Sequence, residues 1–258
     1  MRQIVVAAFI ALTCAGAALN FAGSAAAQAP AENTGPNKTI VRTVTGAVTF
    51  RTISDQRVRG GEKFTVLVYP DGSRQITIIK DFSAVNAQQT IVQRVDKRFR
   101  PLETFAAYWT PAGYKGSIFV AVDGPTLRAV ASGPNGMTDE TLDVPDHIAV
   151  VHHGEIANGW YMWPDDGAAR DEQTSTSYIL NAAPRGGAQV SGFLRDSKFT
   201  RLEADRVTTP AGTFDTTHYK LDTLDIWISG EDRLLVRQTD TANDREYVLT
   251  EINTVHNR

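Results

Sequence analysis

The sequence has very little cysteine: Cys14 is the only one in 258 residues. Because Cys14 lies close to the N-terminus, the rest of the chain has no disulfide, thiolate metal site or cysteine nucleophile. The excess of either charge is also small, with 26 Lys and Arg against 29 Asp and Glu and a net charge of −3. There is no basic stripe, so we expect no nucleic-acid partner.

Several enzyme motifs are missing as well. The sequence contains neither HExxH nor an H-x-H pair, so a zinc site would need distant residues such as His218. There is no G-x-S-x-G, P-loop or dinucleotide fingerprint, and the glycines at Arg57-Val58-Arg59-Gly60-Gly61 are interpreted as a turn with basic flanks. We therefore expect no metal and no cofactor.

The N-terminus carries the clearest signal. Arg2 is followed by an apolar run over 4–19 and by the small-x-small site Ala27-Gln28-Ala29. This order is typical of a secretory signal peptide, which we predict over 1–29 with cleavage and export to the bacterial periplasm. No later stretch of 18 or more apolar residues occurs, so we expect no integral membrane span.

Two further features concern the start of the exported chain. Lipidation at Cys14 would need a small residue before it, but Thr13 stands there and more apolar sequence follows, so we expect no lipid anchor. Residues 30–38 are small and polar and contain proline, which predicts a flexible leader.

From Thr39 onward the hydrophobic period changes to two, which is typical of half-buried strands. One face of the first such segment carries Ile40, Val44, Val48 and Phe50. The turn sequence Pro70-Asp71-Gly72-Ser73 separates two strand-like runs and predicts a hairpin, because proline pre-sets φ and glycine accepts a positive φ.

Strand-like runs then recur at short intervals to the end of the chain. One contains Ile91, Val95 and Phe99, and the others cover 101–109, 115–122, 126–132, 175–182, 188–195, 198–209, 213–221, 224–229, 233–239 and 245–253. No segment has a convincing helical period; 144–153 fits either one short helix or an irregular crossover. We predict an all-β domain over 39–258, with at most one or two short helices. Its strongly curved antiparallel sheet would form a half-barrel or barrel around an apolar cavity.

The C-terminal region resembles a known fold. Its Val207-Thr208-Thr209-Pro210-Ala211-Gly212-Thr213-Phe214 hairpin and its later Trp227-Ile228-Ser229 and Glu231-Asp232-Arg233-Leu234-Leu235 segments carry the resemblance. They are similar to exported half-barrel proteins of unknown function related to the lipoprotein-carrier (LolA/LolB-like) fold. The resemblance implies a curved sheet around a short helical plug with an apolar hollow for acyl chains or other apolar ligands. It carries over no catalytic residue.

Histidine and aromatic residues are concentrated between His147 and Asp166. Stacked rings with a few polar groups are what a pocket for an apolar or aromatic ligand needs. The predicted ligand-binding residues are Trp160, Tyr161, Trp163 and His153, together with Phe214. Alternatively, the two tryptophans only cap one end of the sheet.

The same histidines also offer acid–base chemistry. An imidazole oriented by a carboxylate or phenol works as a general acid or base near neutral pH. If the protein is an enzyme, the candidate catalytic residues are His152, His153, His218 and Asp165, with Tyr161 as an alternative partner.

Three functions are consistent with these features. The first is a periplasmic binding protein for a hydrophobic or aromatic small molecule or lipid held inside the curved sheet. The alternative is a cofactor-independent lyase, isomerase or hydrolase that uses a cavity histidine. A third is an envelope scaffold that pairs through exposed edge strands. The oligomeric state is left open.

Overall fold

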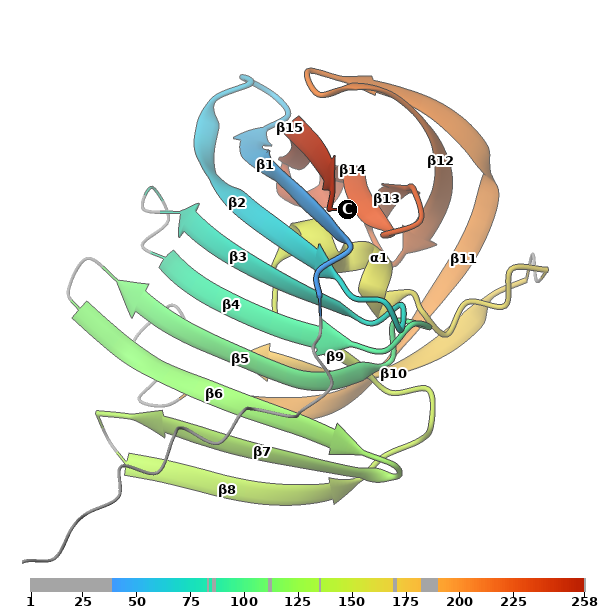
Figure 1. Ribbon diagram of the computed structural model, residues 1–258. Coiled ribbons are helices and arrows are strands. Elements are labelled where there is room, and N and C mark those ends of the chain that lie inside the picture. The colour runs from blue at the N-terminus through green and yellow to red at the C-terminus, as the bar shows by residue number, and fades with distance from the viewer. Residues whose placement is uncertain are drawn as a thin grey trace, which may run out of the picture. The chain divides into compact units, whose positions relative to one another are not determined.

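The computed structural model describes residues 39–257, except 83, 85–86, 111–112, 135, 169–170 and 182–189. The predicted signal peptide and leader lie outside the described residues. Within them the chain forms a single 15-stranded sheet in the order β8-β7-β6-β5-β4-β3-β2-β1-β15-β14-β13-β12-β11-β10-β9 (Figure 1). All pairings are antiparallel except that of β9 with β10. The predicted all-β class, a strongly curved antiparallel sheet, is confirmed.

Two meanders of consecutive strands build this sheet. The first comprises β1 (Arg42–Thr52), β2 (Val58–Val68), β3 (Arg74–Phe82), β4 (Ala87–Val95), β5 (Pro101–Thr110), β6 (Gly113–Asp123), β7 (Thr126–Gly133) and β8 (Gly136–Asp143). The second comprises β10 (Gln173–Asn181), β11 (Ser191–Thr209), β12 (Gly212–Leu221), β13 (Leu224–Ser229), β14 (Leu234–Asp240) and β15 (Arg245–His256). Pairing of β1 with β15 joins them, so the first and last strands lie in the middle of the sheet.

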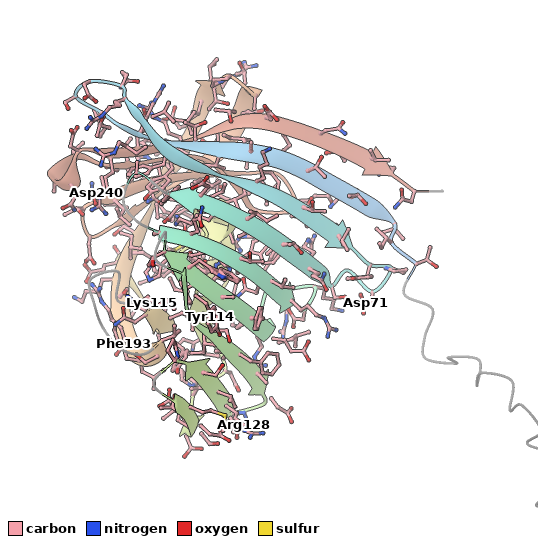
Figure 2. The ribbon with its side chains drawn as sticks, turned by 90° about the vertical axis from the view of Figure 1, so that its left-hand side faces the viewer. Asp71, Tyr114, Lys115, Arg128, Phe193 and Asp240 are labelled. Carbon is pink, nitrogen blue, oxygen red and sulfur yellow. The ribbon has the colours of Figure 1, made fainter. Side chains whose placement is uncertain are left out.

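The sheet curls until its two ends approach each other. Tyr178 on β10 donates a hydrogen bond to Glu140 on β8, although no ladder joins β8 to β9 among the described strands. Side chains project from both faces of the first meander, and Arg128 on β7 lies near its free edge (Figure 2). The sheet is therefore strongly curved but not a closed barrel.

Most strands follow the predicted alternation, and the Pro70–Ser73 hairpin is confirmed, with Gly72 at φ +80°. The prediction of a turn at 57–61 was wrong, because strand β2 already begins at Val58. There Gly60 adopts φ +152° beside a bulge in β2 at Arg59, and a Cβ at this position would collide with the backbone of Asp81. Phe99, predicted in a strand, instead lies in the β4–β5 turn with φ +70°.

The segment 144–153 is an irregular crossover that contains only the short β9 (Ala149–Val151). The helical residues come after it, as a 3-10 turn at Glu155–Ala157 and then α1 (Asn158–Tyr161). All four residues of α1 are buried. A helix without a solvent face has no amphipathic pattern, which is why the position of this one in the sequence was not predicted.

These helical turns, here called the plug (residues 155–161), lie inside the curve of the sheet (Figure 1). Trp160 is buried within the core and its Nε1 donates to the carbonyl oxygen of Asp232 at 2.7 Å. Just beyond the plug, Trp163 Nε1 donates to the carbonyl oxygen of Ile148 at 2.9 Å. Two indole groups thus tie this part of the chain to the loops around it.

Candidate functional site

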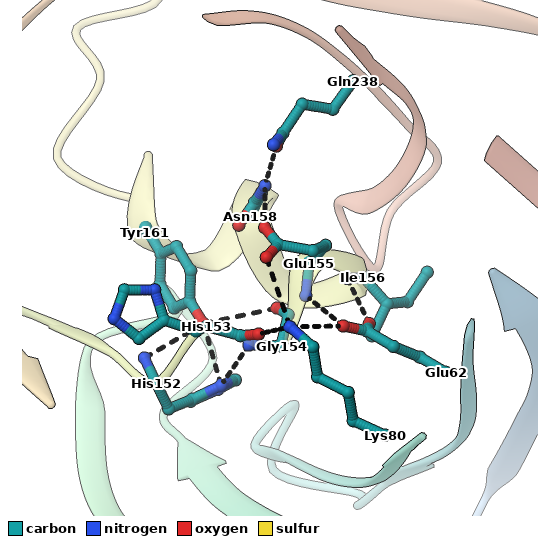
Figure 3. Close-up of polar contacts among 10 residues, drawn as sticks. All are labelled: Glu62, Lys80, His152, His153, Gly154, Glu155, Ile156, Asn158, Tyr161 and Gln238. Carbon is teal, nitrogen blue, oxygen red and sulfur yellow. Dashed lines mark hydrogen bonds and ion pairs between the residues drawn. The ribbon is translucent and has the colours of Figure 1, made fainter. Parts of the chain in front are cut away.

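A glutamate from the sheet holds the start of the plug. Gly154, which precedes the first helical turn, provides no side-chain cap. Instead, Glu62 on β2 accepts hydrogen bonds from the backbone nitrogens of Glu155 at 2.9 Å and Ile156 at 3.1 Å (Figure 3). A carboxylate at this position satisfies free N–H groups and complements the positive end of the helical dipole.

Lys80 on β3 completes this anchor. Its Nζ lies 3.4 Å from Glu62 Oε1 and 3.4 Å from Glu155 Oε1, and it donates to the carbonyl oxygen of His153 (Figure 3). Burial raises the pKa of the Glu62 carboxyl, and the charge of Lys80 acts in the opposite direction. One buried cation therefore fixes two carboxylates and the loop that leads into the plug.

His152 is enclosed beneath the plug, with an exposed fraction of 0%. Its Nδ1 accepts a hydrogen bond from the Gly154 nitrogen at 3.1 Å and lies 2.9 Å from the Tyr161 hydroxyl, while Nε2 lies 3.2 Å from Gln93 Oε1. The Gly154 N–H group can only donate, so Nδ1 must accept and carries no proton. We therefore place the imidazole proton on Nε2, where it is donated to Gln93 Oε1. Burial lowers the pKa of His152 to about 3, so the ring is neutral at ordinary pH.

A cavity with a volume of about 480 Å³ lies between the plug and the inner face of β10 to β15. Its apolar lining comes from Val151, Met162, Ile179, Phe199, Leu221, Leu224, Ile226 and Tyr247, and its polar lining includes His153, Glu155, Asn158, Ser175, Ser177, Arg195, Gln238, Asp240 and Arg245. The apolar cavity expected from the sequence is therefore mixed in character, because charged plug and strand-end residues reach into it. We call it the main cavity.

Two predicted ligand-binding residues, His153 and Tyr161, line the main cavity. His153 adopts φ +61°. The His153 side chain is exposed on the side that borders the cavity, and protein atoms surround its other side. Burial lowers the pKa of His153, and the charge of Glu155 acts in the opposite direction, so this ring also favours the neutral form.

The polar residues that line the main cavity include one whose hydroxyl is unsatisfied. Asn158 Nδ2 donates to Gln238 Oε1 and, at 3.3 Å, to Glu155 Oε2 (Figure 3). Ser175 Oγ, by contrast, is buried and has no hydrogen-bond partner among the described residues. A buried hydroxyl without a partner costs free energy, so a polar ligand atom that reached Ser175 Oγ would recover part of that cost.

The remaining predicted site residues lie elsewhere. Asp165 lines a second cavity of about 440 Å³, and Phe214 lines a third of about 210 Å³. His218 pairs with Asp225 at 3.0 Å and stacks on Trp227, with ring centroids 4.3 Å apart. Since its strand neighbour Tyr219 is buried in the core, His218 faces the outer side of the sheet. The structure thus brings together His153 and Tyr161 at one cavity, but not His218, Asp165 or Phe214 with them.

Sequence reasoning missed Glu62 and Lys80, the two residues that hold the plug. A signal for them was present, because each shares the inner face of its strand with buried apolar residues. Glu62 is in phase with Phe64 and Val66, and Lys80 with Ile76 and Ile78. A charged residue at an apolar phase of a strand indicates a buried partner elsewhere in the chain.

In the described part of the chain, no group of three or more His, Cys, Asp or Glu residues is arranged to hold a metal ion. Nor does any helix found there have the length and apolar character required to cross a bilayer.

No family model matches the chain, and no curated protein matches it. Among solved structures, a DUF1089 family protein from Pseudomonas aeruginosa is similar, with a TM-score of 0.43 and 13% identity over 68% of this chain and 87% of that one. A beta-barrel-like protein of the domain of unknown function DUF1849 from Brucella abortus has a TM-score of 0.42 and 8% identity, over 84% and 99% of the two chains. A candidate lipoprotein from Parabacteroides distasonis has a TM-score of 0.31 and 13% identity, over 84% and 96%.

Proposed function

We propose that the protein binds a small amphiphilic molecule in the main cavity. The observation that carries this proposal is a cavity of about 480 Å³ that combines an apolar wall with polar lining residues, among them Ser175, Asn158 and Gln238. Ligand sites in proteins have volumes in this range and combine apolar walls with a few polar groups that set orientation.

The two kinds of lining residue have different roles in this proposal. Phe199, Met162 and Ile226 cover the apolar part of the ligand, and each Å² of apolar surface removed from water contributes about 25 cal/mol. Ser175, Asn158 and Gln238 meet its polar group. Because Lys80 and Glu62 fix the plug on which Asn158 lies, the position of Asn158 is set before the ligand arrives.

The place of action is part of the same proposal. The predicted signal peptide supports export and a periplasmic location, and the resemblance to the lipoprotein-carrier fold supports a ligand with an acyl or other apolar part. Both are consistent with a carrier or sensor of envelope amphiphiles.

Binding is favoured over catalysis by the position of the histidines. Among the described residues, the imidazole–phenol pair within hydrogen-bond reach is His152 with Tyr161, at 2.9 Å, but His152 has no exposed surface. His153 borders the cavity, but no hydrogen bond joins its ring to a carboxylate or a phenol of the described residues. A general base must reach the proton that it removes, so His152 does not meet this requirement.

A cavity-filling variant tests the proposal. Ser177 on β10 is buried and lines the main cavity, whereas its neighbour Thr176 points to the other face and hydrogen-bonds Asp196 at 2.7 Å. Titration with the fluorescent amphiphile 1-anilinonaphthalene-8-sulfonate should show saturable binding to the wild type and to Thr176→Phe, but not to Ser177→Phe. Native mass spectrometry of the purified protein should detect a bound apolar ligand that the Ser177→Phe variant lacks. Equal probe binding by a folded Ser177→Phe variant would overturn the proposal.

A further inference from the structure

The second cavity, of about 440 Å³, lies between the chain that follows the plug and strands β11 to β13. We call it the polar cavity, because its lining consists mainly of polar and charged residues: Asp165, Gly167, Arg201, Asp215, Thr216, Thr217, Tyr219, Ile228, Ser229, Gly230 and Arg233. It shares no lining residue with the main cavity. Phe199 of the main cavity and Tyr219 of the polar cavity are in ring contact at 6.2 Å, so these two side chains form part of the wall between them.

One buried carboxylate lies in this cavity and is already satisfied. Asp165, with a side chain 3% exposed, accepts hydrogen bonds at Oδ2 from Arg201 Nη1 at 2.9 Å and from the Tyr219 hydroxyl at 2.8 Å. A charge-assisted bond of this kind neutralises one guanidinium.

A second guanidinium in the same cavity has only neutral partners. Arg233 Nη2 donates to the carbonyl oxygen of Met162 at 2.7 Å, lies 3.5 Å from the Tyr219 hydroxyl, and its Cζ lies 5.6 Å from the centre of the Phe99 ring. Among the described residues, the ion pairs found include none for Arg233. Burial lowers the pKa of Arg233, as expected for a desolvated cation, but an arginine stays protonated.

The other carboxylate at this cavity does not supply the missing charge. Asp215 has a side chain 96% exposed and faces Arg206 outside, with Oδ1 3.8 Å from Nε. Arg201 and Arg233 therefore share a single buried carboxylate, and the interior of the polar cavity carries one excess positive charge.

We propose that the polar cavity binds a singly charged oxyanion, a carboxylate or a phosphodiester, with Arg233 as its principal contact and Arg201 as the second. Guanidinium groups suit such oxygens because their N–H donors are held in a planar fork. The site is independent of the main cavity, so it does not depend on the function proposed above. The oxyanion comes either from a free small molecule or from the headgroup of a lipid.

Nuclear magnetic resonance of the arginine Nε–Hε groups tests this site directly. The probes are acetate and dimethyl phosphate as free anions and a short-chain phosphatidylglycerol below its micelle concentration, all at constant ionic strength. We expect saturable shifts of the Arg233 and Arg201 signals. Saturation with the free anions identifies a small-molecule site, and saturation with the lipid alone identifies a headgroup site.

Two variants move the affinity in opposite directions. Arg233→Gln should weaken binding about tenfold or more, because a hydrogen-bonded charge is lost. Asp165→Asn should strengthen it, because the competing carboxylate is removed. The control Arg128→Gln, in an exposed ion pair with Asp139 on β8 at 2.7 Å, should leave the affinity unchanged (Figure 2).

Three results would overturn the proposal: only linear, non-saturable shifts with every probe, equal affinity in Arg233→Gln, or weaker binding in Asp165→Asn. If Arg233→Gln does not fold, Arg233→Lys replaces it and should retain binding with lower affinity, while Arg201→Gln should show the loss.

Discussion

Lys80 and Glu62 are direct partners across strands β3 and β2, and their charged groups lie 3.4 Å apart in side chains that are 5% and 0% exposed. The pair does more than join two strands, because Glu62 also holds the backbone of the plug and Lys80 also pairs with Glu155. A buried ion pair between β-strands thus sets the position of a helical turn, and with it one wall of the main cavity.

Removing the cation should be costly. Lys80→Met leaves two carboxylates facing each other without a counter-charge, so we expect the free energy of unfolding to fall by about 3–5 kcal/mol. Chemical denaturation at neutral pH measures this. The control Lys63→Met, on the exposed face of β2, should change stability by less than about 0.5 kcal/mol.

A double-mutant cycle measures the interaction energy between Glu62 and Lys80 separately from the contacts that each makes with the rest of the protein. Since the Glu62→Gln variant retains a side-chain oxygen for the plug but loses the charge, Glu62→Gln combined with Lys80→Met should cost less than the sum of the two single changes. Strict additivity would show that the two charges do not stabilise each other.

His152 should make stability depend on pH. Its pKa is about 3 in the folded protein and close to 6.5 when unfolded, so between these values the unfolded chain binds more protons. Stability from this residue is complete above pH 6.5 and falls on acidification, by at most about 1.4 kcal/mol per pH unit. Urea unfolding from neutral to acidic pH, compared between wild type and His152→Gln, isolates the contribution: the variant should have the shallower dependence. The exposed His256→Gln should keep the wild-type slope.

The hydrogen bond from Tyr178 to Glu140 should hold the edge strand β8 against β10. In Tyr178→Phe we expect faster amide hydrogen exchange over Gly136–Asp143, since β8 has only β7 as a ladder partner, and a loss of about 1–2 kcal/mol. Tyr114→Phe, which removes a hydroxyl bonded to Ser117 on the surface, should leave β8 unchanged. Unchanged exchange in both variants would mean that the edges are held by packing alone.

The two histidines that remain candidates should behave differently in ligand binding. His153 lines the main cavity, whereas His218 stacks on Trp227 on the outer face. Asparagine tolerates the positive φ of His153, so His153→Asn should keep the fold and weaken binding of 1-anilinonaphthalene-8-sulfonate. His218→Asn should bind it as the wild type does. Weaker binding in His218→Asn but not in His153→Asn would instead indicate a ligand site on the outer face of the sheet.

The strands and their inner faces could be predicted because their signal is local. Alternation in β3, with Ile76 and Ile78 inward, is a property of neighbouring residues and of the two-residue period of a strand. Strand β8 escaped prediction because its residues are mostly exposed and show no alternation. The resemblance implied a helical plug, but its place in the sequence escaped prediction because every residue of α1 is buried.

The sequence by itself determined an antiparallel β architecture, its hairpins, and the concentration of histidine and aromatic residues between 147 and 166. Only the tertiary structure decided which of those residues border a cavity. The contacts that place them, such as Glu62 with the plug or Arg201 with Asp165, join residues far apart in the chain. A strand period specifies which face a side chain occupies, but the curvature of the whole sheet specifies what it meets there.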